Sequence, residues 1–515
     1  MLAMVLKPDA GEVKVDGLTG KKAREIIAYI PQNIVLKKGR RTAKTYLMEC
    51  FLVESGVPAT KMNKKNFSSV QMIPISFLAA ILFGALILML PVSSAAGTWT
   101  PFVDALFTSA TSICVTGLVV VDTGTYWSLF GQIIIVLLIQ MGGLGIITIM
   151  SVILIIAQKR FTLSDRIMLK DSLNLDTTSG VIRFLLKMVR TTFCIEFIGM
   201  LLYSVEFIPR YGFLRGLWIS LFNSVSAFCN AGMDIMGENS LAFYQDNAFV
   251  LGVTMALIVL GGGGFIVWFD LAKKVKNGIK KQFTLIQIVK RFSEHTKLVL
   301  CLTAFFILFG TVIILIAEYN NPETIGNMSL RGKILNSLFE SVTFRTAGFC
   351  TFSQKGLTGI SCVFAYLIMF IGGSPVGTAG GVKTTTFYLA VLNITSYLHG
   401  KDNAGIFHKS VSAEQMRKAS VIVNISIVTV MVLSLLLVCS NHIGIQDGLF
   451  EIVSASATVG LSRDITFTLN TVGKLIVTVA MYLGRIAPIS MAIFLAGIHH
   501  KKKTVKNPEG HFAIG

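Results

Sequence analysis

The stretch from Asp104 to Leu118 reads DALFTSATSICVTGL, and the same plan occurs three more times along the chain. The other copies are SLFNSVSAFCNAGM at 220–233, SLFESVTFRTAGF at 337–349 and LFEIVSASATVGL at 449–461. Each copy has Leu-Phe, then about two helical turns of small and apolar residues, then a tripeptide that ends in glycine. The four glycines, Gly117, Gly232, Gly348 and Gly460, lie 112 to 116 residues apart. This regularity indicates an internal fourfold repeat.

Long apolar segments flank the four copies and predict a membrane protein. Of the 515 residues, 53% are hydrophobic and 14% are charged, whereas soluble domains carry about a quarter charged residues. About 20 consecutive apolar residues cross a bilayer as a helix. Such segments lie near 72–92, 128–157, 191–208, 248–270, 298–317, 361–398, 419–440 and 474–498. Because they are continuous rather than alternating, we expect an all-α membrane protein with about eight transmembrane helices, and not a β-barrel.

The positive residues behind the net charge of +19 lie in short loops between apolar segments. They therefore predict the orientation of the chain in the membrane and not a nucleic-acid partner. Lysine and arginine fill the loops after the second, fourth and sixth segments and the tail after the eighth. By contrast, 93–127 contains neither residue type, and 209–247 contains only Arg210 and Arg215. The positive-inside rule then places both termini in the cytoplasm and all four copies on the outer side of the plasma membrane.

The tripeptides predict a cation filter. A short helix that enters the membrane from outside presents its partially negative C-terminal end to a cation, and the carbonyls of the following loop can replace the ion's water shell. Glycine accepts the backbone conformations that such a loop needs, and irregular backbone within a membrane must line a cavity or be buried in protein. The alternative, that the glycines only pack helices, does not require the shared Leu-Phe context. The predicted filter consists of Val115, Thr116, Gly117, Asn230, Ala231, Gly232, Thr346, Ala347, Gly348, Thr458, Val459 and Gly460.

A second set of glycines follows each copy by about 25 residues, inside the next apolar segment. For Gly142, Gly143 and Gly261–Gly264, close helix packing is the favoured interpretation. The third member is different, because GGSPVGTAGG at 372–381 holds five glycines and Pro375 and cannot form a regular helix. A static helix break and a moving gate both fit this composition. Lys383 follows and either anchors the loop or extends to the membrane interface.

Arg485 lies within the apolar run from Val477 to Leu495, where a charge is costly and usually faces a cavity or a partner. It could form a barrier to cations, tie the fourth repeat to the gate, or belong to a structural ion pair. For Arg345, beside the third tripeptide, we expect a structural role. The cysteines and histidines show no metal-ligand spacing, so we expect no metal besides a transported ion, no covalent cofactor and no catalytic residues.

Several stretches carry a resemblance to a known family: VTGLVVVDTG at 115–124, QMGGLG at 140–145, FNSVSAFCNAG at 222–232, RTAGF at 345–349 and GRIAP at 484–488. From Met62 onward the chain resembles the membrane subunit of Trk/Ktr/HKT-type potassium transporters, closest to the Ktr ion-translocating subunit (KtrB). The residues alone indicate only a monovalent cation pore; the resemblance implies potassium uptake. It also implies four helix–pore-loop–helix units around one pore, a homodimer with one pore per protomer, and an arginine beside the cavity.

The resemblance further implies a gating loop and a cytosolic partner. The gate would comprise Gly372, Gly373, Ser374, Pro375, Gly377, Thr378, Gly380, Gly381 and Lys383. A nucleotide-binding regulatory subunit of the KtrA or TrkA type would dock on the basic inner face. We also expect membrane lipid as a partner, and no nucleic acid. Two alternatives involve sodium. Sodium could act as an activator or coupled ion, or the protein could be a sodium-selective or sodium-coupled transporter of the same fold.

The first 61 residues do not follow the repeat pattern. LKPDAGEVKVDG at 6–17 and IIAYIPQN at 26–33 resemble a fragment of an ABC-transporter ATPase, but the phosphate-binding loop is missing, so we expect no ATP hydrolysis. A gene fusion or a natural start at Met62 is favoured over a functional appendage; an ATP-driven transporter subunit is the alternative. The expected organisation is extension 1–61, pore repeats 62–165, 166–290, 291–400 and 401–500, and a cytoplasmic tail 501–515.

Overall fold

The computed structural model describes residues 14–15, 18–19, 69–156, 166, 169–170, 180–237, 240–400, 405–407 and 409–486. The chain divides into two units, Met1–Asn66 and Phe67–Gly515. In the first unit the described residues form two short antiparallel strands, β1 (Lys14–Val15) and β2 (Leu18–Thr19). The predicted ATPase-like character of 1–61 therefore falls almost wholly outside the described residues.

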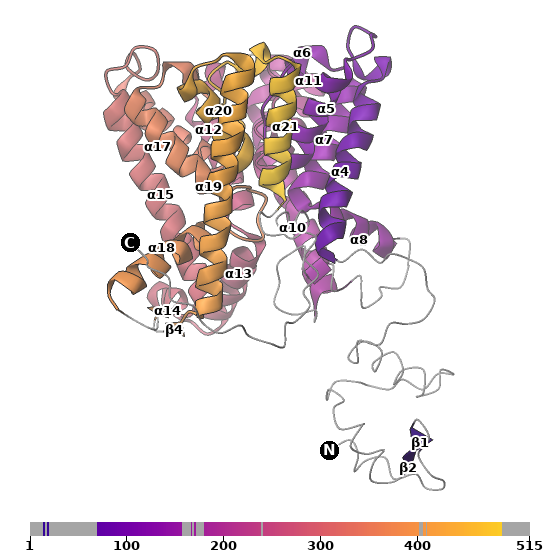
Figure 1. Ribbon diagram of the computed structural model, residues 1–515. Coiled ribbons are helices and arrows are strands. Elements are labelled where there is room, and N and C mark those ends of the chain that lie inside the picture. Colours follow the sequence, from indigo (N-terminus) through magenta and orange to yellow (C-terminus); the bar gives the residue numbers. More distant parts are fainter. Residues whose placement is uncertain are drawn as a thin grey trace, which may run out of the picture. The chain divides into compact units, whose positions relative to one another are not determined.

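The second unit is built from helices that recur in the same order four times (Figure 1). Each repeat has a long first helix, a short helix that carries one of the four copies, and an inner helix. The first two repeats comprise α4 (Ser69–Leu88), α5 (Phe102–Cys114) and α7 (Leu129–Leu144), then α10 (Val181–Tyr211), α11 (Phe213–Cys229) and α12 (Ala248–Gly262). The last two comprise α15 (Glu294–Glu318), α16 (Leu330–Thr343) and α17 (Gly359–Phe370), then α19 (Ala413–Asn441), α20 (Ile445–Ala457) and α21 (Thr471–Arg485).

Further short elements connect these helices. On the side where the short helices begin, they are η1 (Pro91–Ser93), α6 (Thr123–Tyr126), η2 (Ala242–Tyr244), η3 (Gln354–Gly356) and η4 (Thr466–Thr468). On the opposite side, at the bottom of Figure 1, lie α8 (Ile146–Ile156), α13 (Phe265–Lys280), α14 (Leu285–Lys290), α18 (Thr384–Leu398) and the β3–β4 pair (Gly405–Ile406, Lys409–Ser410). We call these the short-helix side and the basic side.

The repeats contact one another in a closed cyclic order. The inner helix of each repeat packs against the short helix of the next: α7 on α11, α12 on α16, α17 on α20, and α21 back on α5. An ion pair joins the last repeat to the first, with 2.6 Å between Lys474 Nζ and Asp104 Oδ1. The four short helices are thereby arranged around one axis.

Serine hydroxyls attach three of the short helices to the first helix of their own repeat. Ser109 Oγ donates to Ile81 O (2.7 Å), and Ser224 Oγ donates to Glu196 O (2.6 Å). Ser341 Oγ donates in the same way to Ile307 O at 2.8 Å. A glycine on each first helix faces the serine, at positions 84, 199 and 310, and a side chain there would collide with the hydroxyl. The fourth copy has isoleucine at this position.

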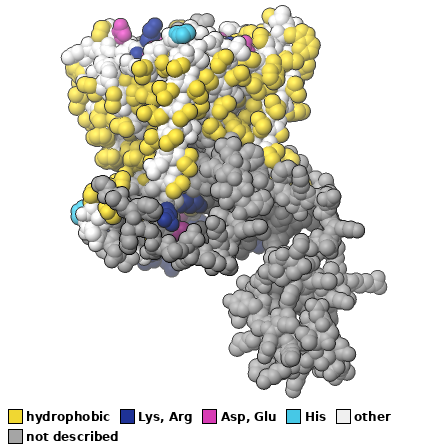
Figure 2. Space-filling model, in the orientation of Figure 1, with side chains coloured by type: hydrophobic (Ala, Val, Ile, Leu, Met, Phe, Trp, Pro, Cys, Tyr) yellow, Lys and Arg dark blue, Asp and Glu magenta, His cyan; other side chains and the backbone are white. Residues whose placement is uncertain are grey.

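Apolar side chains cover the flanks of the helical unit, as Figure 2 shows. Ile316 is 73% exposed and Leu308 is 64% exposed, which suits a lipid environment and not water. Among the described residues, α10, α15 and α19 are long and apolar enough to cross a membrane. The number rises to five if each of the bent pairs α7–α8 and α12–α13 counts as one span.

Two of the predicted apolar segments, 128–157 and 248–270, are not single straight helices. The chain bends by 99° between α7 and α8 and by 98° between α12 and α13. The bends fall at Gly145 (φ 87°, ψ 132°) and Gly264 (φ 86°, ψ 131°), a region that essentially only glycine adopts. Gly264 therefore forms a bend, whereas the sequence predicts close helix packing for the whole run Gly261–Gly264.

Candidate ion filter and gate

The short helices α5, α11 and α20 end one residue before their tripeptides, and α16 ends at Thr343, three residues before Thr346. Val115, Asn230, Thr346 and Thr458 all have the left-handed conformation, with φ between 53° and 65°. This conformation is unfavourable by roughly 1–2 kcal/mol for residues with a side chain and persists only where the surroundings impose it. Backbone bonds close the ends, for example from Thr116 N to Thr111 O at 2.8 Å. The third copy is one residue shorter between its phenylalanine and its glycine, so its ending differs in detail.

A hydroxyl in each short helix holds the loop that follows. It comes four residues after the phenylalanine of Leu-Phe in every copy. Thr111 Oγ1 accepts from Gly117 N (3.0 Å), and Ser454 Oγ accepts from Gly460 N (3.1 Å). Ser226 Oγ accepts from Met233 N at 3.0 Å, while Thr343 Oγ1 donates to Phe349 O at 2.6 Å. This set of hydroxyls was not predicted from the sequence, although its constant offset of four residues from the phenylalanine is visible there.

The four glycines of the predicted filter form a closed ring. A Cβ atom on Gly117 would lie 2.5 Å from Ala231 O, and one on Gly232 would lie 2.6 Å from Ala347 O. A Cβ atom on Gly348 would lie 2.5 Å from Val459 O, and one on Gly460 would collide with Thr116 O, which closes the ring. All four glycines have positive φ, from 66° to 103°. Glycine is therefore required twice over, by conformation and by space, and the middle carbonyls of the four tripeptides meet around one axis.

Several side chains of the predicted filter are buried without a hydrogen-bond partner among the described residues. They are the hydroxyls of Thr116, Thr346 and Thr458 and the Nδ2 atom of Asn230. Buried polar atoms in native proteins nearly always have a partner, from protein, water or an ion. Their gathering at the ring suits a path for hydrated or partly dehydrated cations.

The sequence pattern of the TrkH family, described as cation transport proteins, matches residues 47–507, which include all four repeats. The chain belongs to the TrkH family of cation transport proteins. It is 35% identical over 460 residues to the potassium/sodium uptake protein NtpJ of Enterococcus hirae, covering 88% of this chain and 99% of NtpJ. It is 36% identical over 451 residues to Ktr system potassium uptake protein B of Bacillus subtilis, covering 87% of this chain and 97% of that protein.

The fold has a solved counterpart in the same family. The crystal structure of the potassium transporter TrkH from Vibrio parahaemolyticus matches with a TM-score of 0.67 at 14% identity. The match covers 87% of this chain and 89% of the other. At this identity the likeness shows the fold alone, an all-helical membrane protein with re-entrant segments, which agrees with the fold class expected from the sequence.

The predicted gating loop of this TrkH-family chain lies between α17 and α18, and its neck is closed by backbone pairing of Ile371 with Val382. The loop docks on the junction between α12 and α13 of the preceding repeat. Ser374 N donates to Gly262 O (2.9 Å), and Thr378 N donates to Gly261 O (3.1 Å). From the other side, Phe265 N donates to Val376 O at 2.9 Å. Backbone bonds thus join two glycine-rich segments that are more than 100 residues apart.

The loop also touches the filter itself. Thr378 Oγ1 lies 3.0 Å from both Phe228 O and Asn230 Oδ1. On the opposite side, a side chain on Gly380 would collide with the side chain of Thr458. The loop therefore contacts the second and fourth filter segments at once, directly after the short helices end.

Arg485 and Lys383, two of the three charged residues singled out from the sequence, both bind this region. Arg485 Nη1 donates to Thr378 O at 2.7 Å, and its Nη2 donates to Gly142 O at 2.5 Å. The arginine thus connects the fourth repeat, the loop and α7 through backbone carbonyls. Lys383 Nζ donates to Ala379 O, a bond within the loop that agrees with the anchoring alternative.

Glycines on three inner helices allow close approach to the short helices. A Cβ atom on Gly142, Gly261 or Gly484 would collide with the carbonyl oxygen of Ile113, Phe228 or Ser456, respectively. In every case that carbonyl comes two residues before the left-handed residue of the same repeat. For Gly142 and Gly261 the contact agrees with the packing interpretation; it also belongs to the machinery that places the filter.

Two further buried charges lie beside the filter loops. Glu196, on α10, accepts from Gln140 Nε2 at 3.1 Å and lies 3.7 Å from the thiol of Cys229, the residue before Asn230. Arg345 is buried in the turn that ends the third short helix. Among the described residues, no group of three or more His, Cys, Asp and Glu side chains could hold a metal ion.

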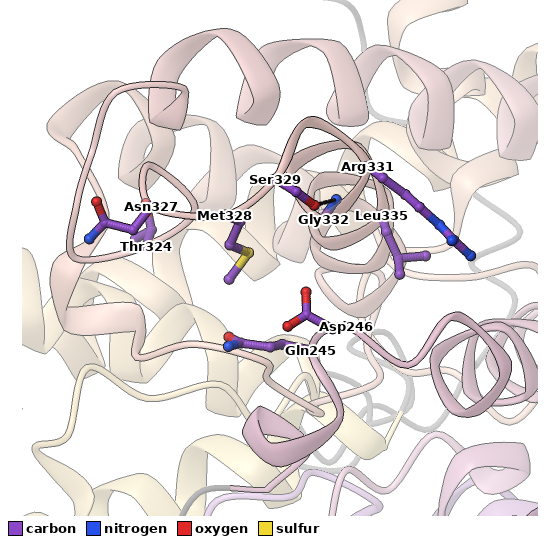
Figure 3. Close-up of a pocket in the computed structure, with 9 residues that line it drawn as sticks. All are labelled: Gln245, Asp246, Thr324, Asn327, Met328, Ser329, Arg331, Gly332 and Leu335. Carbon is purple, nitrogen blue, oxygen red and sulfur yellow. Dashed lines mark hydrogen bonds between the residues drawn. The ribbon is translucent and has the colours of Figure 1, made fainter.

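A separate pocket of about 540 Å³ opens on the short-helix side, between the second and third repeats (Figure 3). Figure 3 shows Gln245 and Asp246 on one side of it, with Met328 and the start of α16 across from them. Its lining is Gln245, Asp246, Thr324, Asn327, Met328, Ser329, Arg331, Gly332 and Leu335. None of these residues belongs to the ring of glycines.

Proposed function

We propose that this protein takes up potassium across the plasma membrane as the ion-conducting subunit of a Ktr- or Trk-type system. The observation that carries the proposal is the closed ring of four glycines, because it places four loops with converging carbonyls around one axis. Relatives named as potassium uptake proteins, which this chain matches over 97% and 99% of their lengths, support the choice of ion.

Conduction begins with dehydration at the ring. Carbonyl oxygens of the four tripeptides and the hydroxyls of Thr116, Thr346 and Thr458 take the place of water around the ion. The four short helices direct their partially negative C-terminal ends toward the same point, which favours a cation over an anion. No side-chain carboxylate belongs to the tripeptides, so the site binds weakly enough for an ion to leave again.

The orientation follows from the distribution of charge. Residues 271–291 on the basic side hold seven lysines and arginines and no acidic residue. By the positive-inside rule this side faces the cytoplasm, together with both termini, and the filter opens to the outside. Eight membrane crossings then arise from one first helix and one inner helix in each repeat.

The loop at 372–383 is the gate in this proposal, and the present arrangement is its closed form. The loop lies just beyond the filter and is held by three backbone bonds to the α12–α13 junction, by Thr378 and by Arg485. The guanidinium group adds a positive charge at the cavity, which raises the barrier to a cation. Opening requires these bonds to break together.

The partners of this function are a second copy of the chain and a cytosolic nucleotide-binding subunit of the KtrA or TrkA type. The name of the Bacillus subtilis relative, a Ktr system protein, supports a multisubunit system. In this arrangement the nucleotide acts through the cytosolic subunit, and the basic side is the docking face.

The test is rescue of growth at low potassium in a strain that lacks its own uptake systems, followed by flux measurements in vesicles. We expect rescue, and faster flux of potassium than of sodium. Sodium transport is the second candidate, because the Enterococcus hirae relative is named for both ions. Sodium flux that equals or exceeds potassium flux would replace the first proposal by the second.

A further inference from the structure

Helix α13 has an exposed apolar stripe beside a row of lysines. Trp268, Ala272, Val275 and Ile279 follow a spacing of four, three and four, which places them on one face of the helix. Ile279 is 70% exposed and Val275 is 40% exposed. Lys273, Lys276 and Lys280 are exposed along the adjoining face.

Trp268, the first residue of the apolar stripe, packs against α12 of its own repeat. At Trp268 the helix has just turned by 98° from α12, yet the indole Nε1 donates back to Leu260 O of α12 at 2.7 Å. The ring also contacts Gly263 at the bend. Since α12 lies in the membrane, the face that holds Trp268 is the one nearest the bilayer, and Val275 and Ile279 continue it outward.

Helix α13 is held firmly in this position. Asp270 accepts from Ser293 N (2.9 Å) and from Thr296 Oγ1 (2.8 Å) at the start of α15. At the far end, Phe283 N donates to Gly278 O (2.9 Å), and α14 folds back so that Ile288 packs against Gly278.

We propose that α13 is a binding site for anionic phospholipid of the leaflet on the basic side. The apolar stripe enters the boundary between headgroups and acyl chains, and the lysines beside it bind phosphate groups. Seven positive charges and no negative ones between 271 and 291 provide the complementary charge. An acidic protein would satisfy the lysines, but it would not cover a stripe that faces the bilayer.

Bound lipid would also stabilise the closed gate, a consequence that rests on the proposed function. The residues at the start of α13 are the ones that hold the loop, through Phe265 N to Val376 O and through the carbonyls of Gly261 and Gly262. A lipid that fixes α13 in the headgroup layer keeps this junction in the geometry to which the loop docks.

The test measures lipid binding to the purified full-length protein in detergent, by native mass spectrometry with phosphatidylglycerol and with phosphatidylcholine. The variant Lys276→Gln/Lys280→Gln removes two charges beside the stripe. The control Arg417→Gln/Lys418→Gln removes two exposed charges from α19 on the same side. A lysine near an anionic surface contributes about 1 kcal/mol, so we expect about 30-fold weaker binding of the tightest phosphatidylglycerol in the α13 variant. Phosphatidylcholine binding, and both lipids in the control, should not change.

Equal phosphatidylglycerol binding by the α13 variant and the unmodified protein would overturn the lipid site. So would an equal loss in the control, which would indicate a general effect of charge. If the α13 variant keeps lipid binding but loses association with a cytosolic nucleotide-binding subunit, the lysines serve a protein partner and the proposal is wrong. Binding is measured without transport, so a failure of potassium uptake would refute the proposed function alone.

Discussion

Replacement of Thr378 by valine tests how the gating loop is held below the filter. Valine keeps the branched shape of threonine but removes the hydroxyl that lies 3.0 Å from Phe228 O and from Asn230 Oδ1. The hydroxyl has a single proton, so it can donate to only one of these acceptors at a time. The backbone bonds of residue 378, to Gly261 O and from Arg485, do not depend on the side chain.

The expected size of the effect follows from that single bond. A neutral hydrogen bond contributes about 1 kcal/mol net, which corresponds to about a fivefold change in the ratio of undocked to docked loop. While the docked loop predominates, uptake in the absence of a cytosolic partner should rise by about the same factor. The assay is the initial rate of rubidium or potassium uptake into vesicles that contain equal amounts of purified protein.

Ser374→Ala is the matched control, because it removes a hydroxyl from the same loop. Ser374 Oγ is buried and has no hydrogen-bond partner within the described residues, so its removal should leave the rate nearly unchanged. Thermal unfolding of both variants checks that the protein stays intact. The reasoning is refuted if Thr378→Val takes up ions no faster than the unmodified protein, or if Ser374→Ala raises the rate as much.

Three other outcomes follow from the same geometry. Arg485→Gln should raise the vesicle uptake rate by more than tenfold, because a hydrogen bond from a charged donor contributes about 1.5–3 kcal/mol. The rate of Arg485→Lys should lie between those of Arg485→Gln and the unmodified protein. Equal rates in all three proteins would contradict the role of Arg485 at the gate. Gly232→Ala should abolish growth rescue, since its Cβ atom would lie 2.6 Å from Ala347 O. The control Gly252→Ala, whose Cβ atom would meet nothing within 4 Å, should rescue growth fully. Rescue by Gly232→Ala would argue against the ring. Deletion of residues 1–61 should leave the potassium uptake rate unchanged, and its loss would revive the alternative of an ATP-driven transporter subunit.

The repeat could be read from the sequence because its signals are local. Leu-Phe, small residues and a terminal glycine stand within about a dozen positions of one another, and the apolar segments around them are continuous. The need for Gly117, Gly232, Gly348 and Gly460 followed from the same pattern. What these positions require in detail, a positive φ and no side chain next to a neighbouring carbonyl, became visible only with all four loops in place.

Other features could not be predicted from the sequence, because a residue type alone does not reveal the role of the residue. Gly261 and Gly264 stand in one run of four glycines, yet Gly261 permits close packing and Gly264 makes a bend. Both roles need only the absence of a side chain, so the sequence does not separate them. Val115 is a β-branched residue in a left-handed conformation, against its own preference, because the hydroxyl of Thr111 and the neighbouring loops hold the backbone there.

The sequence alone indicates a helical membrane protein of four repeats, each with one glycine of the predicted filter. It also shows that the third repeat has an unusual glycine-rich loop and the fourth an arginine within an apolar segment. The three-dimensional arrangement adds how the repeats close into a ring, that the loop docks on the second repeat, and that Arg485 joins the loop to Gly142 O. The physical reason is the range of the interactions. Propensity and hydrophobicity act over a few residues, whereas these hydrogen bonds join atoms of residues more than 100 positions apart, and their partners exist only once the four repeats surround a common axis.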